Sequence, residues 1–239
     1  MRSLFVVCCA VAGMWLLACT NTESENVMTD GIHADITVTA TGNGQTEVGA
    51  SMRVGSASNT YLNLSGADQL FAIKGSERKK MTERQLLGAV WYTATFDSDE
   101  AETEFAVSFE REVDASAPNS HGTLPAAFSL TAPAASAEFS RANDTITITW
   151  EPSAGPDRIH VAADGSCIKP YNDDLDGDPG TTTINPNTFK EPDDEDLQGK
   201  DCKVTIELRR TRSGDVDPAF EGGDFVARQV RTVQINSKP

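Results

Sequence analysis

The sequence predicts an all-β protein built from two tandem antiparallel β-sandwich domains, and three observations support this prediction. After residue 31 the apolar residues recur with a period of two, helical periodicity is nearly absent, and turn-forming residues separate the short apolar runs. Successive side chains of a strand point to opposite faces, so this period predicts strands with one buried face and one wet face. Several such strands need a second sheet to cover them, which favours a sandwich.

The composition is that of a folded, acidic protein. The chain has 239 residues, of which 38% are hydrophobic and 23% charged, and its formal net charge is -16. This length fits one or two domains. The negative charge repels phosphate at long range, which argues against a nucleic-acid partner, and it disfavours adsorption to anionic lipids. Any membrane attachment is therefore expected to be covalent or hydrophobic.

Residues 1–18 are predicted to form an export signal. Arg2 precedes an apolar run of about fifteen residues, too short for the ~20 residues of a membrane-spanning helix. At its end, Leu16-Leu17-Ala18-Cys19 resembles the lipobox of bacterial lipoproteins. The resemblance implies a diacylglyceryl group on the thiol of Cys19, cleavage before this residue and acylation of the new amino group. A plain secretory signal, with Cys19 as an ordinary residue, is the alternative.

The resemblance also implies a lipid-anchored place in the bacterial cell envelope, with the bilayer as a partner through acylated Cys19. Aspartate after the cysteine favours retention at the inner membrane, and Thr20 stands there instead, so the outer membrane is expected. Residues 19–31 are rich in Thr, Asn, Glu and Ser and have no apolar periodicity. They are predicted to form a short disordered tether.

The first sandwich domain is predicted over residues 32–112. Turn residues such as Thr41-Gly42-Asn43-Gly44 separate its apolar runs. Six strands are expected, over Ile36–Ala40, Val48–Val54, Tyr61–Leu64, Gln69–Ile73, Val90–Phe96 and Phe105–Phe109.

A linker is predicted over residues 113–125, because Ala, Ser, Pro, Asn and Gly dominate there and bulky apolar residues are few.

The second sandwich domain is predicted over residues 126–239. In its last strand, Val226 and Val230 share one parity while Val233 and Ile235 have the other, which predicts a bulge near Arg231. Its other alternating runs end at Trp150, Val161 and Leu208.

The segment from Thr145 to Pro152 resembles the fibronectin type III strand that carries a buried tryptophan and ends in proline. Leu197, with the alternation from Val204 to Leu208, is similar to the leucine and penultimate strand of that family. The resemblance implies that Trp150 is buried in an immunoglobulin-like sandwich. It implies no particular activity, because such sandwiches host many functions.

Cys167 and Cys202 remain once the lipobox cysteine and the two cysteines of the signal are set aside. An exported compartment is oxidising, so the simplest prediction is a disulfide between them. Two separate buried thiols are the alternative. A zinc site is disfavoured, because paired cysteine spacing and neighbouring histidines are missing.

Asn172, Asp174 and Asp176, followed by Gly177, resemble the opening of a calcium-binding loop. Oxygen ligands at alternate positions and a glycine for the turn suit a hard cation. Thr183 occupies the twelfth position, where the loop expects a bidentate glutamate. A solvated acidic loop explains the same residues, and we favour it.

No catalytic motif is recognisable around the three histidines, His33, His121 and His160, and no enzyme activity or cofactor is expected. The sequence predicts a membrane-anchored cell-envelope lipoprotein acting as a non-catalytic binding or scaffolding module for an envelope protein or glycan. A calcium-stabilised surface adhesion module is one alternative, and an envelope hydrolase is a second.

Overall fold

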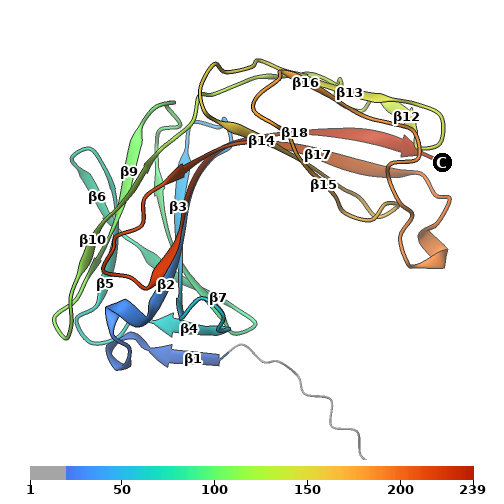
Figure 1. The fold of residues 1–239 in the computed structure, drawn as a ribbon. Helices are drawn as coiled ribbons and strands as arrows, with labels where there is room; N and C mark the ends of the chain where they lie inside the picture. Colours follow the sequence, from blue (N-terminus) through green and yellow to red (C-terminus); the bar gives the residue numbers. More distant parts are fainter. Residues whose placement is uncertain (1–19) are drawn as a thin grey trace, which may run out of the picture.

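The computed structural model describes residues 20–239 (Figure 1). The export signal, the lipobox and Cys19 lie outside the described residues. Within 20–239 the regular structure is β-strand, apart from three short 3₁₀ helices: Ser24–Asn26 (η1), Thr29–Gly31 (η2) and Glu195–Leu197 (η3). The all-β prediction is therefore confirmed. In this part of the chain no helix has the length and hydropathy that crossing a bilayer requires.

Ten strands precede residue 125 and build the first half of the molecule. They are β1 (Thr20–Glu23), β2 (Ile32–Ala40), β3 (Thr46–Val54), β4 (Thr60–Asn63), β5 (Gln69–Lys74), β6 (Glu77–Lys80), β7 (Thr82–Leu86), β8 (Ala89–Phe96), β9 (Glu104–Glu110) and β10 (Ala117–Thr123). All six strands expected here are present, and β1, β6, β7 and β10 are additional.

Eight strands follow. They are β11 (Leu130–Ala132), β12 (Glu138–Ser140), β13 (Ile146–Trp150), β14 (Arg158–Asp164), β15 (Tyr171–Asp174), β16 (Thr181–Ile184), β17 (Cys202–Gly214) and β18 (Gly222–Lys238). The first seven, with the end of β18, build the second half.

Each half is a sandwich with its own apolar core. In the first half, the sheet β10-β9-β5-β6 packs against β2, β3 and β8, with Phe96, Phe105 and Phe109 fully buried between the sheets. In the second half, β11-β13-β16 packs against β14, β17 and β18 around Ile148 and Trp150. The alternation read from the sequence produces these cores, because every second residue of β2 and β13 points inward.

One sheet runs through both sandwiches, in the strand order β1-β4-β3-β2-β18-β17-β14-β15. Strand β18 pairs parallel with β2 over Gly222–Gln229 and antiparallel with β17 from Phe225 to Ser237. Phe225 belongs to the first core and Ile235 to the second. Strand β18, within the range 126–239 that was predicted as the second domain, thus contributes residues to both cores.

The linker predicted over 113–125 contains strand β10, which pairs with β9. Its small residues reflect tight packing, not flexibility. A Cβ atom added to Gly122 would lie 2.6 Å from the ring of Phe225, and Ala117 and Ser120 are fully buried. His121 exchanges two backbone hydrogen bonds of 2.8 Å with Asp215. Small side chains allow β10 to approach the end of β17 this closely.

The disordered tether predicted over 19–31 is also wrong from Thr20 onward. Strand β1 pairs parallel with β4, and η1 and η2 follow it directly. The buried guanidinium of Arg111 binds this segment, since it donates to the carbonyl oxygens of Ser24 at 2.7 Å and Val27 at 2.9 Å. Arg111 lies more than eighty residues further along the chain, and its hydrogen bonds hold in place a segment whose composition is typical of a tether.

The bulge predicted near Arg231 is absent from the pairing of β17 with β18, which keeps one register from Cys202↔Ser237 to Gly214↔Phe225. The inward positions of β18 are the odd ones, which include Phe225, Ala227, Gln229 and Ile235. Val226 lies on the other face, as its partner Thr37 on β2 does.

The predicted disulfide between Cys167 and Cys202 is confirmed, with 5.7 Å between the two Cα atoms. Cys202 opens β17 and Cys167 precedes β15, so the bond closes a loop that contains the acidic segment.

Replacing both cysteines by serine is expected to lower the free energy of unfolding by about 2–4 kcal/mol, because the unfolded chain loses a constraint. Urea denaturation measures the change. Wild-type protein in the presence of a reductant should match the double variant. Identical urea curves for oxidised and reduced wild-type protein would show that the bond is missing.

Candidate binding surface

The exposed face of the continuous sheet is the candidate functional surface. The molecule is bent like an arch, with β2 and β3 on the inner side of the first half and β14, β15 and β17 on the inner side of the second (Figure 1). The cores occupy the opposite faces of these strands. The wet sides of both sandwiches therefore form one inner surface across the bend.

Three arginines on neighbouring strands lie at the middle of this surface. Arg228 of β18 is in register with Thr211 of β17, which is in register with Arg158 of β14. Two residues further along each strand, and on the same face, Arg209 of β17 is in register with His160 of β14. Carboxylates lie on the same face, since Glu207 pairs with Arg209 and Asp174 contacts His160, so the charges here are mixed.

The arginines differ in their partners. Arg209 donates through Nε to Glu207, whereas Arg228 donates through Nε to the hydroxyl of Thr39 at 2.8 Å. Desolvation lowers the pKa of Arg228, and the positive charge of Arg209 lowers it further. Arg158 is exposed. Within residues 20–239, neither Arg158 nor Arg228 has a carboxylate oxygen within 4.0 Å of its guanidinium, unlike Arg209 and Arg212. These two cations are therefore available to an acidic partner.

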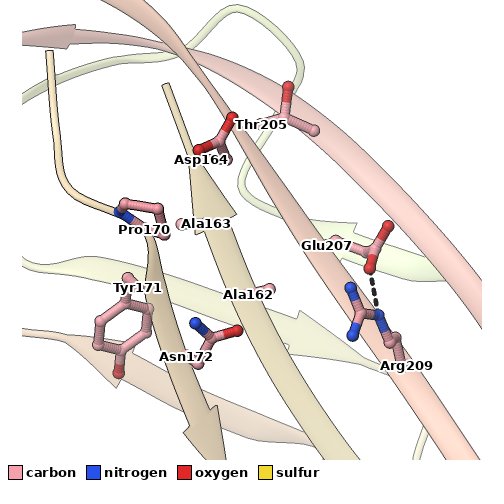
Figure 2. Close-up of a pocket in the computed structure, with 9 residues that line it drawn as sticks. All are labelled: Ala162, Ala163, Asp164, Pro170, Tyr171, Asn172, Thr205, Glu207 and Arg209. Atoms are coloured by element: carbon pink, nitrogen blue, oxygen red, sulfur yellow. Dashed lines mark hydrogen bonds and ion pairs between the residues drawn. The ribbon is translucent and has the colours of Figure 1, made fainter. Parts of the chain in front are cut away.

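Three depressions lie along the surface. The first, of about 350 Å³, is lined from β14, β15 and β17 by residues that include Asp164, Asn172 and Arg209 (Figure 2). The second, of about 540 Å³, lies around Arg158 and His160. The third, of about 330 Å³, is lined by Thr37, Thr39, Thr41, Asn43, Gln45, Glu47, Thr95 and Arg228. Hydroxyl, amide and charged groups dominate the lining of the third depression, which suits a polar partner, whereas the first two expose polar and apolar surface in similar amounts.

The predicted calcium ligands do not form a loop around a common centre. Asn172 and Asp174 belong to β15, which pairs with β14, and both contact His160. Nδ1 of His160 lies 2.7 Å from Asp174 Oδ1, and its Nε2 lies 3.2 Å from Asn172 Oδ1. Asp176 follows the end of the strand. Among residues 20–239, no three His, Cys, Asp or Glu side chains are grouped to hold a metal ion. Asn172 and Asp174 therefore lie along an extended strand, which does not wrap a cation as a calcium-binding loop does.

Arg212 joins the two halves beside this surface. Its guanidinium makes two hydrogen bonds to Glu102, of 2.6 and 3.0 Å, and two to Asp157, of 2.7 and 3.1 Å. Glu102 precedes β9 in the first half and Asp157 precedes β14 in the second. The hydrogen bonds from Arg212 hold the pKa of Glu102 below its usual value. The contact bridges the bend, so it helps to set the angle between the two parts of the surface.

The sequence prediction did not single out Arg158 or Arg228. The signal was available, because both residues alternate with inward-facing ones on strands that the period of two predicts. What the sequence could not supply is the order of the strands, which brings Arg158, Arg209 and Arg228 onto neighbouring positions.

Comparisons with known proteins leave the family open. No protein-family model matches the chain, and no curated protein matches it. Among solved structures, one chain of the Dpr11 IG1 complex with DIP-gamma IG+IG2 is 7% identical, with a TM-score of 0.25 over 87% of this chain and 98% of that one. The FN1–FN3 domains of chicken CNTN1 are 13% identical, with a TM-score of 0.26 over 93% of this chain and 69% of that one.

A third similar structure is the SGBP-B protein of the Bacteroides ovatus mixed-linkage glucan utilization locus, in complex with a mixed-linkage heptasaccharide. It is 9% identical, with a TM-score of 0.22 over 97% of this chain and 69% of that one. These scores carry no argument about the present chain, whose β-sandwich architecture rests on its own strand pairing.

Proposed function

We propose that this protein is a lipid-anchored cell-envelope protein that acts as a non-catalytic binding module, with the inner surface of the arch as its binding site. The observation that carries the proposal is the pair of arginines without ion-pair partners, Arg158 and Arg228, on the exposed face of the continuous sheet. An anchor on Cys19, as the lipobox resemblance implies, would hold this surface at the membrane.

The surface favours an extended partner that carries carboxylates, either an envelope protein or a glycan. Guanidinium groups bind carboxylates through paired hydrogen bonds, and two of them here are free to do so. Threonine hydroxyls line the first half of the surface and add hydrogen-bonding groups. Both ring nitrogens of His160 already face side-chain oxygens, so the residue is a poor candidate for a general base.

Site-specific photo-crosslinking in intact cells tests the proposal. A photoreactive amino acid replaces Thr211, at the middle of the surface, and in a matched control it replaces Thr147, an exposed residue of β13 on the outer sheet. We expect a discrete adduct from position 211 and none from 147. Mass spectrometry of the adduct distinguishes a protein from a glycan.

Charge reversal tests the role of the arginines. R158E and R228E should each reduce the yield of the adduct about tenfold or more, because a favourable ion pair becomes a repulsion. R84E, an exposed change on β7, serves as the control for net charge. Equal yields from positions 211 and 147, or yields that charge reversal leaves unchanged, would contradict the proposed surface.

A further inference from the structure

Large apolar side chains are exposed at one end of the first half. In residues 20–239 the exposed large apolar residues are Met28, Leu86, Leu87, Val113 and Leu197, and Leu87 is the most exposed at 92%. Leu86 and Leu87 form the tip of the β7–β8 hairpin. Strand β7 pairs only with β8 and all its residues are exposed, so the hairpin projects from the sheet.

The tip carries a residue that its turn disfavours. Leu86 pairs with Ala89, so the loop has two residues, Leu87 and Gly88, with φ of 49° and 86°. Two-residue loops with both φ values positive favour Asn, Asp or Gly at the first position, where a branched side chain is strained. Leu87 gains no burial in return for this strain. A strained and exposed leucine points to a contact outside the folded chain.

The same tip touches the segment that follows Cys19. With the Asn21 amide oriented to satisfy its neighbours, its nitrogen donates to the carbonyl of Gly88 at 2.7 Å and its oxygen accepts from Gln85 at 2.9 Å. Asn21 stands two positions after Cys19, a reach of at most ~7 Å. Figure 1 shows β1, β4 and β7 together at this end of the molecule.

Two further exposed apolar residues, Met28 and Val113, lie in or beside the same N-terminal segment. Met28 lies between η1 and η2, and the next residue, Thr29, donates its backbone N–H to Asp114 at 2.6 Å. Asp114 follows Val113. Four of the five exposed large apolar residues thus lie within residues 21–29 or in segments that are hydrogen-bonded to them.

We infer that the β7–β8 hairpin tip, with Leu86 and Leu87, inserts into the lipid bilayer beside the anchored N-terminus and orients the arch on the membrane. The inference rests on the proposed lipid anchor at Cys19, because the anchor is what brings this end to the bilayer. Glu23, Glu25 and Asp30 are exposed nearby. The contact is therefore hydrophobic, not electrostatic, and should be insensitive to salt.

The test uses the acylated protein purified from membranes in detergent and reconstituted into phosphatidylcholine vesicles. A polarity-sensitive NBD fluorophore is attached to a new cysteine in L87C, and in the control N43C to the tip of the β2–β3 hairpin. The probe at 87 should emit at shorter wavelength and be quenched by brominated phosphatidylcholine, in low and high salt alike. The probe at 43 should show neither effect.

A second variant, L86T/L87N, separates membrane contact from folding. Asparagine suits the turn better than leucine, so this variant should keep or raise the melting temperature. Quenching of the half-exposed Trp91 by brominated lipid should fall about threefold or more relative to wild type, while Trp150 is buried in both.

The outcomes separate the two claims. Acylated, vesicle-bound protein whose position 87 is as solvated as position 43 would overturn the inference and leave the anchor intact. A probe at 87 that is shielded but not quenched by brominated lipid would indicate contact with a second copy of the chain, and would also overturn it. Protein without acyl chains on Cys19 contradicts the proposed anchor itself.

Discussion

Replacing Arg210 by alanine is expected to lower the free energy of unfolding by about 3–5 kcal/mol. The Arg210 and Asp178 side chains are each 1% exposed and form an ion pair of 2.7 Å. The guanidinium also donates to the carbonyl oxygens of Ala126 and Ala127, at 2.9 and 3.2 Å. Alanine would leave a buried carboxylate without its counter-ion and would release the segment that connects the two halves.

Urea denaturation followed by the fluorescence of Trp150 measures this loss, because the indole N–H of Trp150 donates to Asp178 at 2.6 Å. Arg158, exposed on the same sheet, provides the control, and R158A should change stability by less than about 0.5 kcal/mol. Similar stabilities for R210A and R158A would contradict the structural role assigned to the buried pair.

Replacing Arg111 by alanine is expected to cost a similar amount, about 3–5 kcal/mol, and to free the N-terminal segment. Arg111 has no exposed side-chain surface and pairs with Asp68 at 3.1 Å. It also donates to the hydroxyl of Thr29 at 3.0 Å, in addition to the carbonyls of Ser24 and Val27. Without it, η1 and η2 lose the guanidinium hydrogen bonds to Ser24, Val27 and Thr29, while β1 keeps its pairing with β4.

Hydrogen exchange checks the second part of this prediction, since amide protection should fall first in residues 20–31. R78A is the control, because Arg78 forms a surface ion pair with Glu110, and such pairs contribute ~1 kcal/mol or less. R111A/D68A should cost less than the sum of the two single changes, because the double variant leaves no unpaired charge. Additive costs would show that the two residues do not act as a pair.

Much of the fold was predictable because a half-buried strand has a simple period. Alternation such as Ile146, Ile148, Trp150 identified the strands of both cores, and Trp150 is buried as the fibronectin type III resemblance implied. The oxidising compartment and the two remaining cysteines predicted the disulfide correctly.

The errors have physical reasons in particular residues. In β18, Val226 and Val230 suggested a change of face, but the inward positions at the junction of the two cores include the polar Gln229. The acidic alternation at Asn172 and Asp174 is shared by calcium loops and by the wet face of a strand, and the pairing with β14 decides for the strand. The N-terminal segment has the composition of a tether, yet Arg111 binds it from far along the chain.

Order in the N-terminal segment changes the consequence of an anchor. A disordered tether of twelve residues would let the body move up to ~40 Å from the leaflet. Because β1 begins at Thr20, a lipid on Cys19 would instead lie directly against the folded protein. The binding surface would then have a fixed height and orientation above the membrane.

The central claim, that lipid on Cys19 attaches this folded body to the membrane, is tested most directly by mass spectrometry of the intact protein extracted from cell membranes. The account predicts a chain that begins at Cys19 and carries the mass of a diacylglyceryl group, with or without an additional amide-linked acyl chain. A chain recovered from the soluble fraction with an unmodified Cys19, or one that still begins at Met1, would contradict it.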